Sequence, residues 1–389
     1  MDKRWQDVAR RFYRASRGRY DIELSPQQLL KELETEADGD QACPKLPFAV
    51  FVDFMVRALL STRNKPSLRR LARRSVRPSI QRISGVVQVS HQAVADRLQT
   101  VDLDSLRTFF QLVNRAARRL LGRGFQRRGQ LNLFDCTTNE ARAEAVPWAA
   151  DNGDKKAVRI LVGISGTSDL PHTVTDASAT TNDNSVFAAI VKALRPGDIG
   201  VFDAGFTKLV RFRDIMAKGA HFVARMTRSY HVEVLHRYPL PRGEGARFEE
   251  WYLLEDARAL VGTPASGGPI EARRAIWTKF NEDGTAALRA IWTDLFALPP
   301  KRIFEIDRIR WRSEVQFRWL KSELGLAHLA SYDHHGVQAY FLLLLLAWIC
   351  LRLFDARQQG TPVDQFSCAE ALDAWETALE YYLLGGAVP

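Results

Sequence analysis

Residues 198–225 read DIGVFDAGFTKLVRFRDIMAKGAHFVAR. The stretch opens with a short apolar strand that ends before Asp203, and an amphipathic helix follows over about 208–218. A second strand then covers 221–225. Strands and helices that alternate in this way are typical of an α/β domain in which helices cover a sheet. The stretch therefore predicts an α/β fold class.

The preceding residues extend this pattern. Apolar runs at 131–134 and 158–164, with a weaker run at 170–174, predict three strands. A helix is expected over 185–194, with Asn184 as its cap. Three strands followed by alternating helix and strand predict a mixed sheet.

The alternation stops over residues 228–297. Short alternating runs are separated here by Gly, Pro and Asp-Gly turns, which predicts a small antiparallel β insertion. Helix is expected to resume at Pro299-Pro300 and to run to about Leu324, because proline suits the start of a helix. A buried helix over 337–354 and a short amphipathic helix over 368–384 complete the pattern.

The first 125 residues have helical spacing of apolar positions and a strong positive charge. Residues 1–130 hold 26 Lys and Arg against 13 Asp and Glu, a surplus of +13, whereas the net charge of the chain is +10. Such asymmetry is typical of proteins that bind a polyanion, above all nucleic acid. The alternative is a solvated, arginine-rich helical surface. The densest group of cations is Arg63, Lys65, Arg69, Arg70, Arg73, Arg74, Arg77 and Arg82.

The segment that follows these cations, residues 83–98, resembles the turn and second helix of a helix-turn-helix. Gly85 permits a sharp turn, Ser90 is suited to cap the helix, and Val94 with Leu98 are expected to face inward. DNA contact is then expected from the start of this helix, at His91 and Gln92, and from Arg69, Arg70, Arg73 and Arg74. Any capped amphipathic helix would also fit the pattern.

Two aspartates follow apolar strands. Asp135 is expected directly after the strand 131–134, and Asp203 directly after the strand that ends at Phe202. If these strands lie side by side, both carboxylates can reach one pair of metal ions, which can clamp the attacking and leaving oxygens of a phosphoryl displacement. Taken alone, aspartate after a strand is more often a turn residue or a helix cap.

A third acidic residue lies in a charged helical segment, residues 307–321, DRIRWRSEVQFRWLK. At helical spacing Arg310, Glu314 and Lys321 project from one side. A surface ladder of salt bridges is the commoner meaning of such a pattern. The same residues would also suit a metal site on DNA, with Glu314 completing the metal shell while Arg310 and Lys321 hold the phosphate backbone.

These motifs resemble the insertion-sequence transposases of the DDE type, which have a ribonuclease-H-like core. Within them the chain is similar to the branch with the signature Tyr-x2-Arg-x3-Glu-x6-Lys, which Arg310, Glu314 and Lys321 match in spacing. Asp307 stands at the position of the family tyrosine, and Ala204 stands where arginine is common. The resemblance covers about residues 130–355 well.

The resemblance implies a Mg²⁺-dependent DNA transposase, with two ions held by the catalytic residues Asp135, Asp203 and Glu314 and with Mn²⁺ able to substitute. It implies cleavage that leaves a 3′-OH, attack by that hydroxyl on the opposite strand or on target DNA, and stacking of Trp311 on a flipped base. The expected partners are double-stranded transposon ends and target DNA and a second copy of the chain, as a homodimer. The alternatives are a catalytically inactive transposase-derived DNA-binding protein and a hydrolytic nuclease of the same fold.

The expected organisation has five segments. They are a helical DNA-binding region (1–125), the first part of the core (126–227), the β insertion (228–297), the second part of the core with the Glu314 helix (298–356), and a C-terminal helix (357–389).

Composition supports a cytoplasmic protein, associated with the nucleoid when bound to DNA. The four cysteines lie far apart without a C-x-x-C pair, which argues against a disulfide framework or a standard zinc module. The longest apolar run, 339–351, is shorter than the roughly 20 residues of a membrane span. No secretory signal and no contact with a membrane are expected.

Overall fold

The computed structural model describes residues 46–62, 66–121, 130–141, 146–152, 155–166, 168–178, 183–206, 208–225, 230–326, 328–358 and 366–383. By its contacts the chain divides into two compact units. One unit comprises residues 122–140 and 149–318 and contains the β-sheet. The other comprises residues 1–121, 141–148 and 319–389 and is helical in its described part.

The core of the sheet is built from strands on both sides of β1. The strands are β1 (Leu131–Ala141), β2 (Ala150–Asn152), β3 (Lys155–Ser165), β4 (Pro171–Ser178), β5 (Ile199–Phe202) and β6 (His221–Arg225). β3 lies next to β1 on one side and pairs with both β2 and β4, while β5 and then β6 follow on the other side. β1, β5 and β6 run parallel, and β3 and β4 run antiparallel to each other.

This order confirms the ribonuclease-H-like prediction. Leaving out the three-residue β2, the strands lie in the chain order third, second, first, fourth, fifth, which is the order of that core. The two parallel pairings follow from the crossover helices α8 (Asp183–Ala193) and α9 (Leu209–Ala217), because a parallel neighbour requires a connection across the sheet. The mixed sheet predicted from the apolar runs is therefore present.

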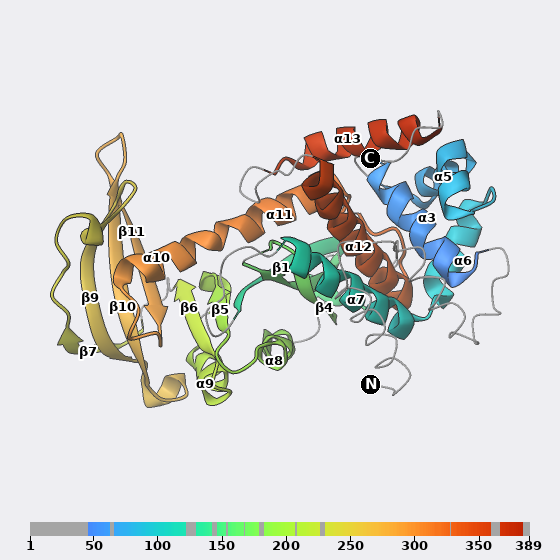
Figure 1. The fold of residues 1–389 in the computed structure, drawn as a ribbon. Coiled ribbons are helices and arrows are strands. Elements are labelled where there is room, and N and C mark those ends of the chain that lie inside the picture. The colour runs from blue at the N-terminus through green and yellow to red at the C-terminus, as the bar shows by residue number, and fades with distance from the viewer. Residues whose placement is uncertain are drawn as a thin grey trace. The chain divides into compact units, whose positions relative to one another are not determined.

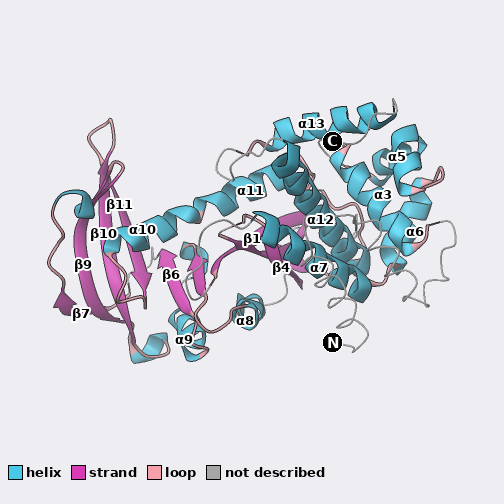
Figure 2. Ribbon diagram, in the orientation of Figure 1, coloured by secondary structure: helices cyan, strands magenta, loops and turns pink. Residues whose placement is uncertain are grey.

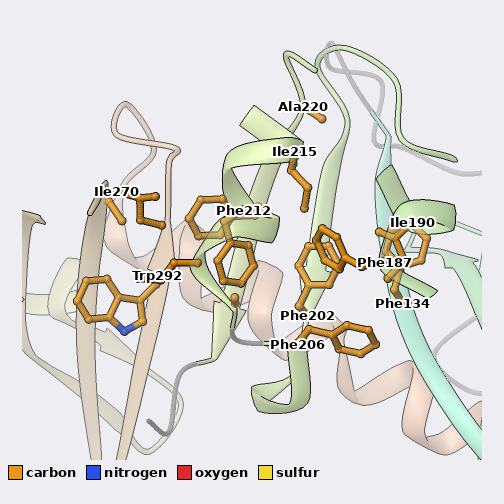
Figure 3. Close-up of a cluster of buried hydrophobic side chains, with 14 of the residues drawn as sticks. Phe134, Phe187, Ile190, Phe202, Phe206, Phe212, Ile215, Ala220, Ile270 and Trp292 are labelled. Carbon is orange, nitrogen blue, oxygen red and sulfur yellow. The ribbon is translucent and has the colours of Figure 1, made fainter. Parts of the chain in front are cut away.

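Aromatic side chains fill the space between this sheet and the crossover helices (Figure 3). Phe202 lies at the centre, with ring centroids 5.8 Å from Phe134 and 6.0 Å from Phe212. Phe212 in turn stacks on Phe222 at 4.4 Å. Burial of such rings is the main stabilising contribution of a core of this kind, since each removes 150–250 Å² or so from water.

The β insertion forms the far part of the same sheet (Figure 2). Its strands are β7 (Val232–Arg237), β8 (Arg247–Phe248), β9 (Trp251–Val261), β10 (Ile270–Phe280) and β11 (Ala286–Thr293), with single helical turns η3 (Gly243–Ala246) and η4 (Pro264–Ser266) between them. They pair antiparallel, as predicted. β11 also pairs antiparallel with β6, so the insertion extends the core sheet.

The charged segment after the insertion forms two consecutive helices, α10 (Pro300–Ile309) and α11 (Trp311–Ser322). The prediction of one continuous helix to about Leu324 is thus wrong at Arg310. The amide of Arg310 donates to the carbonyl of Asp307, and the amide of Ser313 donates to the carbonyl of Arg310. These bonds span three residues instead of four, so the chain tightens by a local 3₁₀-type turn between the two helices.

The helical unit packs around α12 (His334–Gln358), which contacts α3, α6, α7 and α13 (Figure 1). The helices of this unit are α3 (Phe48–Leu60), α4 (Leu68–Arg73), η1 (Arg74–Val76), α5 (Pro78–Ser84), α6 (His91–Thr100), α7 (Leu103–Leu121), α12 and α13 (Cys368–Leu383). The segment His334–Ala356 is long and apolar enough to cross a membrane by composition, but 78% of its most apolar window is buried inside the protein. That burial matches the core helix predicted for 337–354.

The boundary between the two units falls between Arg318 and Trp319, so α12 belongs to the helical unit. The physical reason is that α12 is apolar on all sides and buries them against helices from the N-terminal third and against α13.

Candidate active site

Asp135 lies in β1, and Asp203 follows directly after β5, the neighbouring parallel strand. Leu131 pairs with Ile199 and Leu133 with Val201, a constant difference of 68 residues. Each aspartate comes two residues after the pair Leu133–Val201. Neighbouring strands are about 4.8 Å apart, so this register brings the segments that carry the two aspartates close together although 68 residues separate them.

The two aspartates differ in their local setting. Asp203 follows directly after β5, as predicted, and leads into the helical turn η2 (Ala204–Phe206), where the amide of Phe206 donates to the carbonyl of Asp203. Asp135 was expected after its strand, and this is wrong: β1 continues to Ala141. The apolar run ends at Phe134, but apolarity marks only the buried part of a strand, and a polar continuation gives no apolar signal.

The ring pair before these positions fixes the register. Phe134 and Phe202 stack with centroids 5.8 Å apart and ring planes within 10°. Both side chains are fully buried, with exposed fractions of 1% and 0%. A slip of one residue would turn one ring out of the core, so burial of the pair opposes any other alignment of the two strands.

Glu314 lies in the first turn of α11, in the same compact unit as the two aspartates. Its Oε1 accepts a charge-assisted hydrogen bond from Nη1 of Arg310 at 2.6 Å. The Arg310 side chain is buried, with 8% exposed, whereas the Glu314 side chain is one-third exposed. The predicted Arg310–Glu314 proximity is therefore observed, but the arginine is buried, unlike a member of a surface salt-bridge ladder.

A buried amide ties α11 to the core sheet. Gln316, 3% exposed, donates through Nε2 to the carbonyl of Asp169 at 2.9 Å. Asp169 has a left-handed backbone with φ of 54° in the turn between β3 and β4. The amide of Gly166 in that turn donates to the carbonyl of Leu131 in β1. The start of α11 is thus connected to β1 through two hydrogen bonds and one turn.

The other two predicted DNA contacts of the charged segment, Trp311 and Lys321, are exposed. The Trp311 side chain begins α11 and is 50% exposed, which is unusual for a tryptophan and leaves its ring open to solvent. Lys321 is exposed in the last turn of α11 and belongs to the helical unit. With this exposure, Trp311 lies outside the hydrophobic core.

The donor set of the three acidic residues fits a hard divalent cation. Carboxylate oxygens are the ligands that Mg²⁺ and Mn²⁺ prefer, and two of the carboxylates come from β1 and from the residue after its parallel neighbour β5. Among the side chains that the structure describes, which do not include that of Asp135, no group of three or more His, Cys, Asp and Glu could hold a metal ion.

Comparison with known families agrees with this geometry. Residues 126–350, more than half of the chain, match the family model of the transposase DDE domain. The chain belongs to the DDE transposases. The matched residues include all three acidic residues and both parts of the core. The protein is thus a DNA transposase, an enzyme that cuts and joins DNA strands, and divalent metal ions serve the chemistry of its family.

The individual relatives each share less than a quarter of their aligned residues with this chain. Over 280 residues the transposase is 23% identical to "Probable transposase for insertion sequence element IS5377" of Geobacillus stearothermophilus, which covers 72% of this chain and 71% of that one. Over 227 residues it is 24% identical to y4zB of Sinorhizobium fredii, also named as a transposase, covering 58% of this chain and 61% of that one. Among solved structures, the piggyBac transposase synaptic complex with hairpin DNA matches with a TM-score of 0.44 and 11% identity, over 90% of this chain and 76% of that one.

The basic helices of the transposase expose most of the predicted cations. Arg69, Arg70 and Arg73 on α4 are exposed, whereas Arg74 is half-buried and donates to Oγ1 of Thr62. Burial lowers the pKa of Arg74, and the neighbouring Arg77 lowers it further. Arg77 is bonded to Glu376 of α13 at 2.9 Å. Arg63 and Lys65 lie outside the described residues.

The turn between α5 and α6 has the expected form. Gly85 ends α5 in a left-handed conformation with φ of 71°, and Oγ of Ser90 accepts from the amide of Ala93 to cap α6. Val94 and Leu98 are fully buried. His91 and Gln92 are exposed at the start of α6. A surface hollow of about 300 Å³ lies beside them, lined by Arg69, Ala72, Arg73, Val76, Gln88, Val89 and His91.

The sequence pattern did not predict that Asp307, the first residue of the charged segment, contacts two arginines from the sheet. Asp307 is 3% exposed, and its Oδ2 lies 3.1 Å from Nη1 of Arg289 and 3.9 Å from Nε of Arg225. Arg225 is the last residue of β6, and Asp203 comes directly after β5. This position at the carboxyl end of a strand was the sequence signal that could have identified Arg225. Arg289 lies within β11 and gives no local signal, because alternation alone does not distinguish one strand cation from another.

Proposed function

We propose that this transposase cleaves DNA at transposon ends and transfers the new 3′ end to target DNA, with Asp135, Asp203 and Glu314 as its catalytic carboxylates. The observation that carries the proposal is the position of Asp135 and Asp203, each two residues after a paired position of the parallel strands β1 and β5, in a chain of the DDE transposase family. Glu314 is the acidic residue of α11, the second helix after the β insertion, and belongs to the same unit.

The three carboxylates would hold two Mg²⁺ ions, for which Mn²⁺ can substitute. When bound, the ions supply an activated water and stabilise charge on the attacking and leaving oxygens of the phosphodiester. Asp135 in β1 and Asp203 directly after β5 would be held rigidly, since both strands have a neighbouring strand on each side. The liberated 3′-OH then serves as the nucleophile, either on the opposite strand or on target DNA, and positioning gives this second step its rate.

The charged segment would position the DNA. Arg310 uses one terminal nitrogen for Glu314, and the guanidinium has five N–H donors in total, so others remain for a phosphate. Lys321 would hold a second phosphate as a point charge. Trp311, half exposed, would stack on a base extruded near the cut.

The N-terminal region would bind the transposon end. Arg69, Arg70, Arg73 and Arg74 would neutralise phosphates, while His91 and Gln92 at the start of α6 would approach base edges. Two ends must be held together for transfer, so a homodimer on double-stranded DNA is the proposed working form. We further propose residues 1–125 as the binding region, 126–227 and 298–356 as the catalytic core, 228–297 as its insertion and 357–389 as a C-terminal helix, in a cytoplasmic protein that associates with the nucleoid.

The products of the reaction test this function. Labelled fragments carrying the DNA that flanks the reading frame are incubated with the protein and Mg²⁺, Mn²⁺ or a chelator, with and without target plasmid. Metal-dependent cuts that leave 3′-OH ends, followed by joined products, are expected. Cutting without joining would indicate a hydrolytic nuclease, and binding without cutting would indicate an inactive DNA-binding protein.

Salt dependence tests the binding role of α4. The double variant Arg69→Gln/Arg73→Gln is expected to lower affinity for an end fragment and to reduce the slope of log Kd against log salt by about 2, because each lost phosphate contact releases one counterion fewer. Fluorescence anisotropy at several salt concentrations measures both values. Arg258→Gln, an exposed arginine on β9, is the matched control and should leave the slope unchanged. An unchanged slope in the double variant would remove α4 from the interface.

A further inference from the structure

A buried carboxylate lies among four arginines, one of which is bonded to Glu314. Asp307, on α10, lies 3.1 Å from Arg289 of β11 and 3.9 Å from Arg225 of β6. The positive charges of Arg308 and Arg310 also favour the ionised form of its carboxyl. Burial raises the pKa of the Asp307 carboxyl, and the arginines oppose that shift in the order Arg289, Arg225, Arg310, Arg308. The cluster belongs entirely to the sheet-containing unit.

Three of the four arginines either donate a hydrogen bond to a carboxylate or pair with a carboxylate other than that of Asp307. Arg289 donates to Asp307 and packs over the rings of Trp251 and Phe304 at 4.8 and 5.5 Å. Arg310 donates to Glu314 at 2.6 Å, and Arg308 lies 3.8 Å from Glu249. Arg225 differs from Arg289 and Arg310 because its 3.9 Å separation from Asp307 is an ion pair but too long for a hydrogen bond, and it differs from Arg308 because its ion pair is with Asp307 itself.

Arg225 also has the exposure that a ligand needs. Its side chain is 31% exposed, against 13% for Arg289, 8% for Arg310 and 1% for Asp307. Arg308 is also exposed, at 37%, but it pairs with Glu249. The Oδ1 atom of Asp307 and the Nε atoms of Arg289 and Arg310 are buried without a partner among the described atoms. Of the two exposed arginines, Arg225 is therefore the one whose ion pair is with the buried carboxylate of Asp307.

The sheet register places Arg225 in line with the catalytic aspartates. Ile199 pairs with His221 and Phe202 with Ala224, a constant difference of 22 residues. Asp203 is the residue after Phe202, and Arg225 is the residue after Ala224. Because β1, β5 and β6 are consecutive parallel strands, Leu133, Val201 and Val223 form one row across the sheet, and Asp135, Asp203 and Arg225 each come two residues later.

We propose that Asp307 is a positioning residue that holds Arg225 two residues past this row, level with Asp203, where Arg225 binds a phosphodiester of the DNA backbone close to the cut. The proposal rests on the proposed function for its ligand. Arg225 supplies the donors, while Asp307 supplies the charge that keeps two arginines together without DNA.

The physical argument is one of charge balance. Without the carboxylate, the buried guanidinium of Arg289 would lose its anionic partner, and Arg225, Arg308 and Arg310 would face it with like charge. Arg225 would then move toward solvent and away from its place beside Asp203. The cluster has four cations and one buried anion. The negative charge of a phosphate that binds near Arg225 is therefore stabilised there.

Neutral phosphate analogues test the contact between Arg225 and DNA. End fragments are made with a single uncharged methylphosphonate at each position around the cut, and their Kd values are measured without divalent metal, so that the result does not depend on cleavage. In the wild-type protein one position should weaken binding by about tenfold or more, because hydrogen bonds to a charged group are lost. In Arg225→Gln that same substitution should cost less than about threefold further. Equal costs in both proteins at every position would overturn the proposal.

The role of Asp307 is tested with the same fragments. Asp307→Asn keeps the shape and removes the charge, and it should lose the sensitivity at the position identified with Arg225. If Asp307→Asn fails to fold, Asp307→Asn/Arg289→Gln removes both partners of the buried pair and takes its place in the same measurement. Wild-type sensitivity in the folded variant would overturn the positioning role. Arg274→Gln, from a half-buried pair with Glu255, is the control and should behave as wild type.

The two proposals fail in different ways. A protein that shows the position-specific loss in Arg225→Gln but cuts no DNA in any metal would contradict the proposed function while supporting the phosphate site. A protein that cuts and joins DNA but shows no such loss would support the function and overturn the site.

Discussion

Asp203→Asn and Glu314→Gln are each expected to lower the rate of end cleavage by at least about 10³-fold, while the Kd for an end fragment changes less than about threefold. Each substitution removes one anionic ligand of the proposed metal pair, and stabilisation of the transition state by such ions is worth several kcal/mol or so. Affinity should be preserved because most of it comes from cations that neutralise phosphates.

The measurement is a single-turnover cleavage assay with labelled fragments, beside anisotropy for binding. Asp214→Asn, on α9 within the same unit, serves as the matched control and should cut at the wild-type rate. Wild-type cleavage by either Asp203→Asn or Glu314→Gln would defeat the assignment of that residue. Loss of binding by a folded variant would contradict the separation of cutting from binding.

The largest effect on stability is expected at a buried ion pair of the insertion. Arg273 contacts Asp256 through two hydrogen bonds of 2.7 and 2.6 Å, and their side chains are only 7% and 2% exposed. Arg273 also donates to the carbonyl of Phe296 and packs over the ring of Tyr238. Asp256→Ala should lower the free energy of unfolding by about 3–5 kcal/mol, because it leaves the arginine charge buried without its partner.

Urea unfolding monitored by tryptophan fluorescence checks this value. Asp256→Leu/Arg273→Met removes both charges and should lose less stability than Asp256→Ala, since no uncompensated charge remains. Glu271→Gln, in the more exposed pair with Arg258, should have little effect. If Asp256→Ala unfolds at the wild-type urea concentration, the pair makes no net contribution to the stability of the sheet.

Local pattern predicted much of the core. Period-two and period-3.6 spacing located β5, α9 and β6 within the stretch 198–225, and it placed Asp203 directly after its strand. Apolarity on all sides predicted that α12 is buried. These features depend on residues within a few positions of one another, and that is the range over which periodicity carries information.

The residues at which β1 and the helix after the insertion end were harder to predict. β1 extends past Phe134 as a polar strand because its backbone pairs with a neighbour, and pairing needs no apolar side chain. The turn at Arg310 separates α10 from α11 although its residues are compatible with one helix. In both cases the structure is decided by backbone hydrogen bonds, which do not depend on the spacing of apolar residues in the sequence.

By itself, the sequence determined the strand and helix types, the antiparallel insertion, and the candidates Asp135, Asp203 and Glu314. Only the tertiary structure decided that Asp135, Asp203 and Arg225 each follow the same row of paired positions on β1, β5 and β6, and that Asp307 contacts arginines from β6 and β11. The reason is that strand register and burial of charge are set by contacts between segments far apart in the chain. Such contacts depend on which surfaces exclude water together, and no local period encodes that choice.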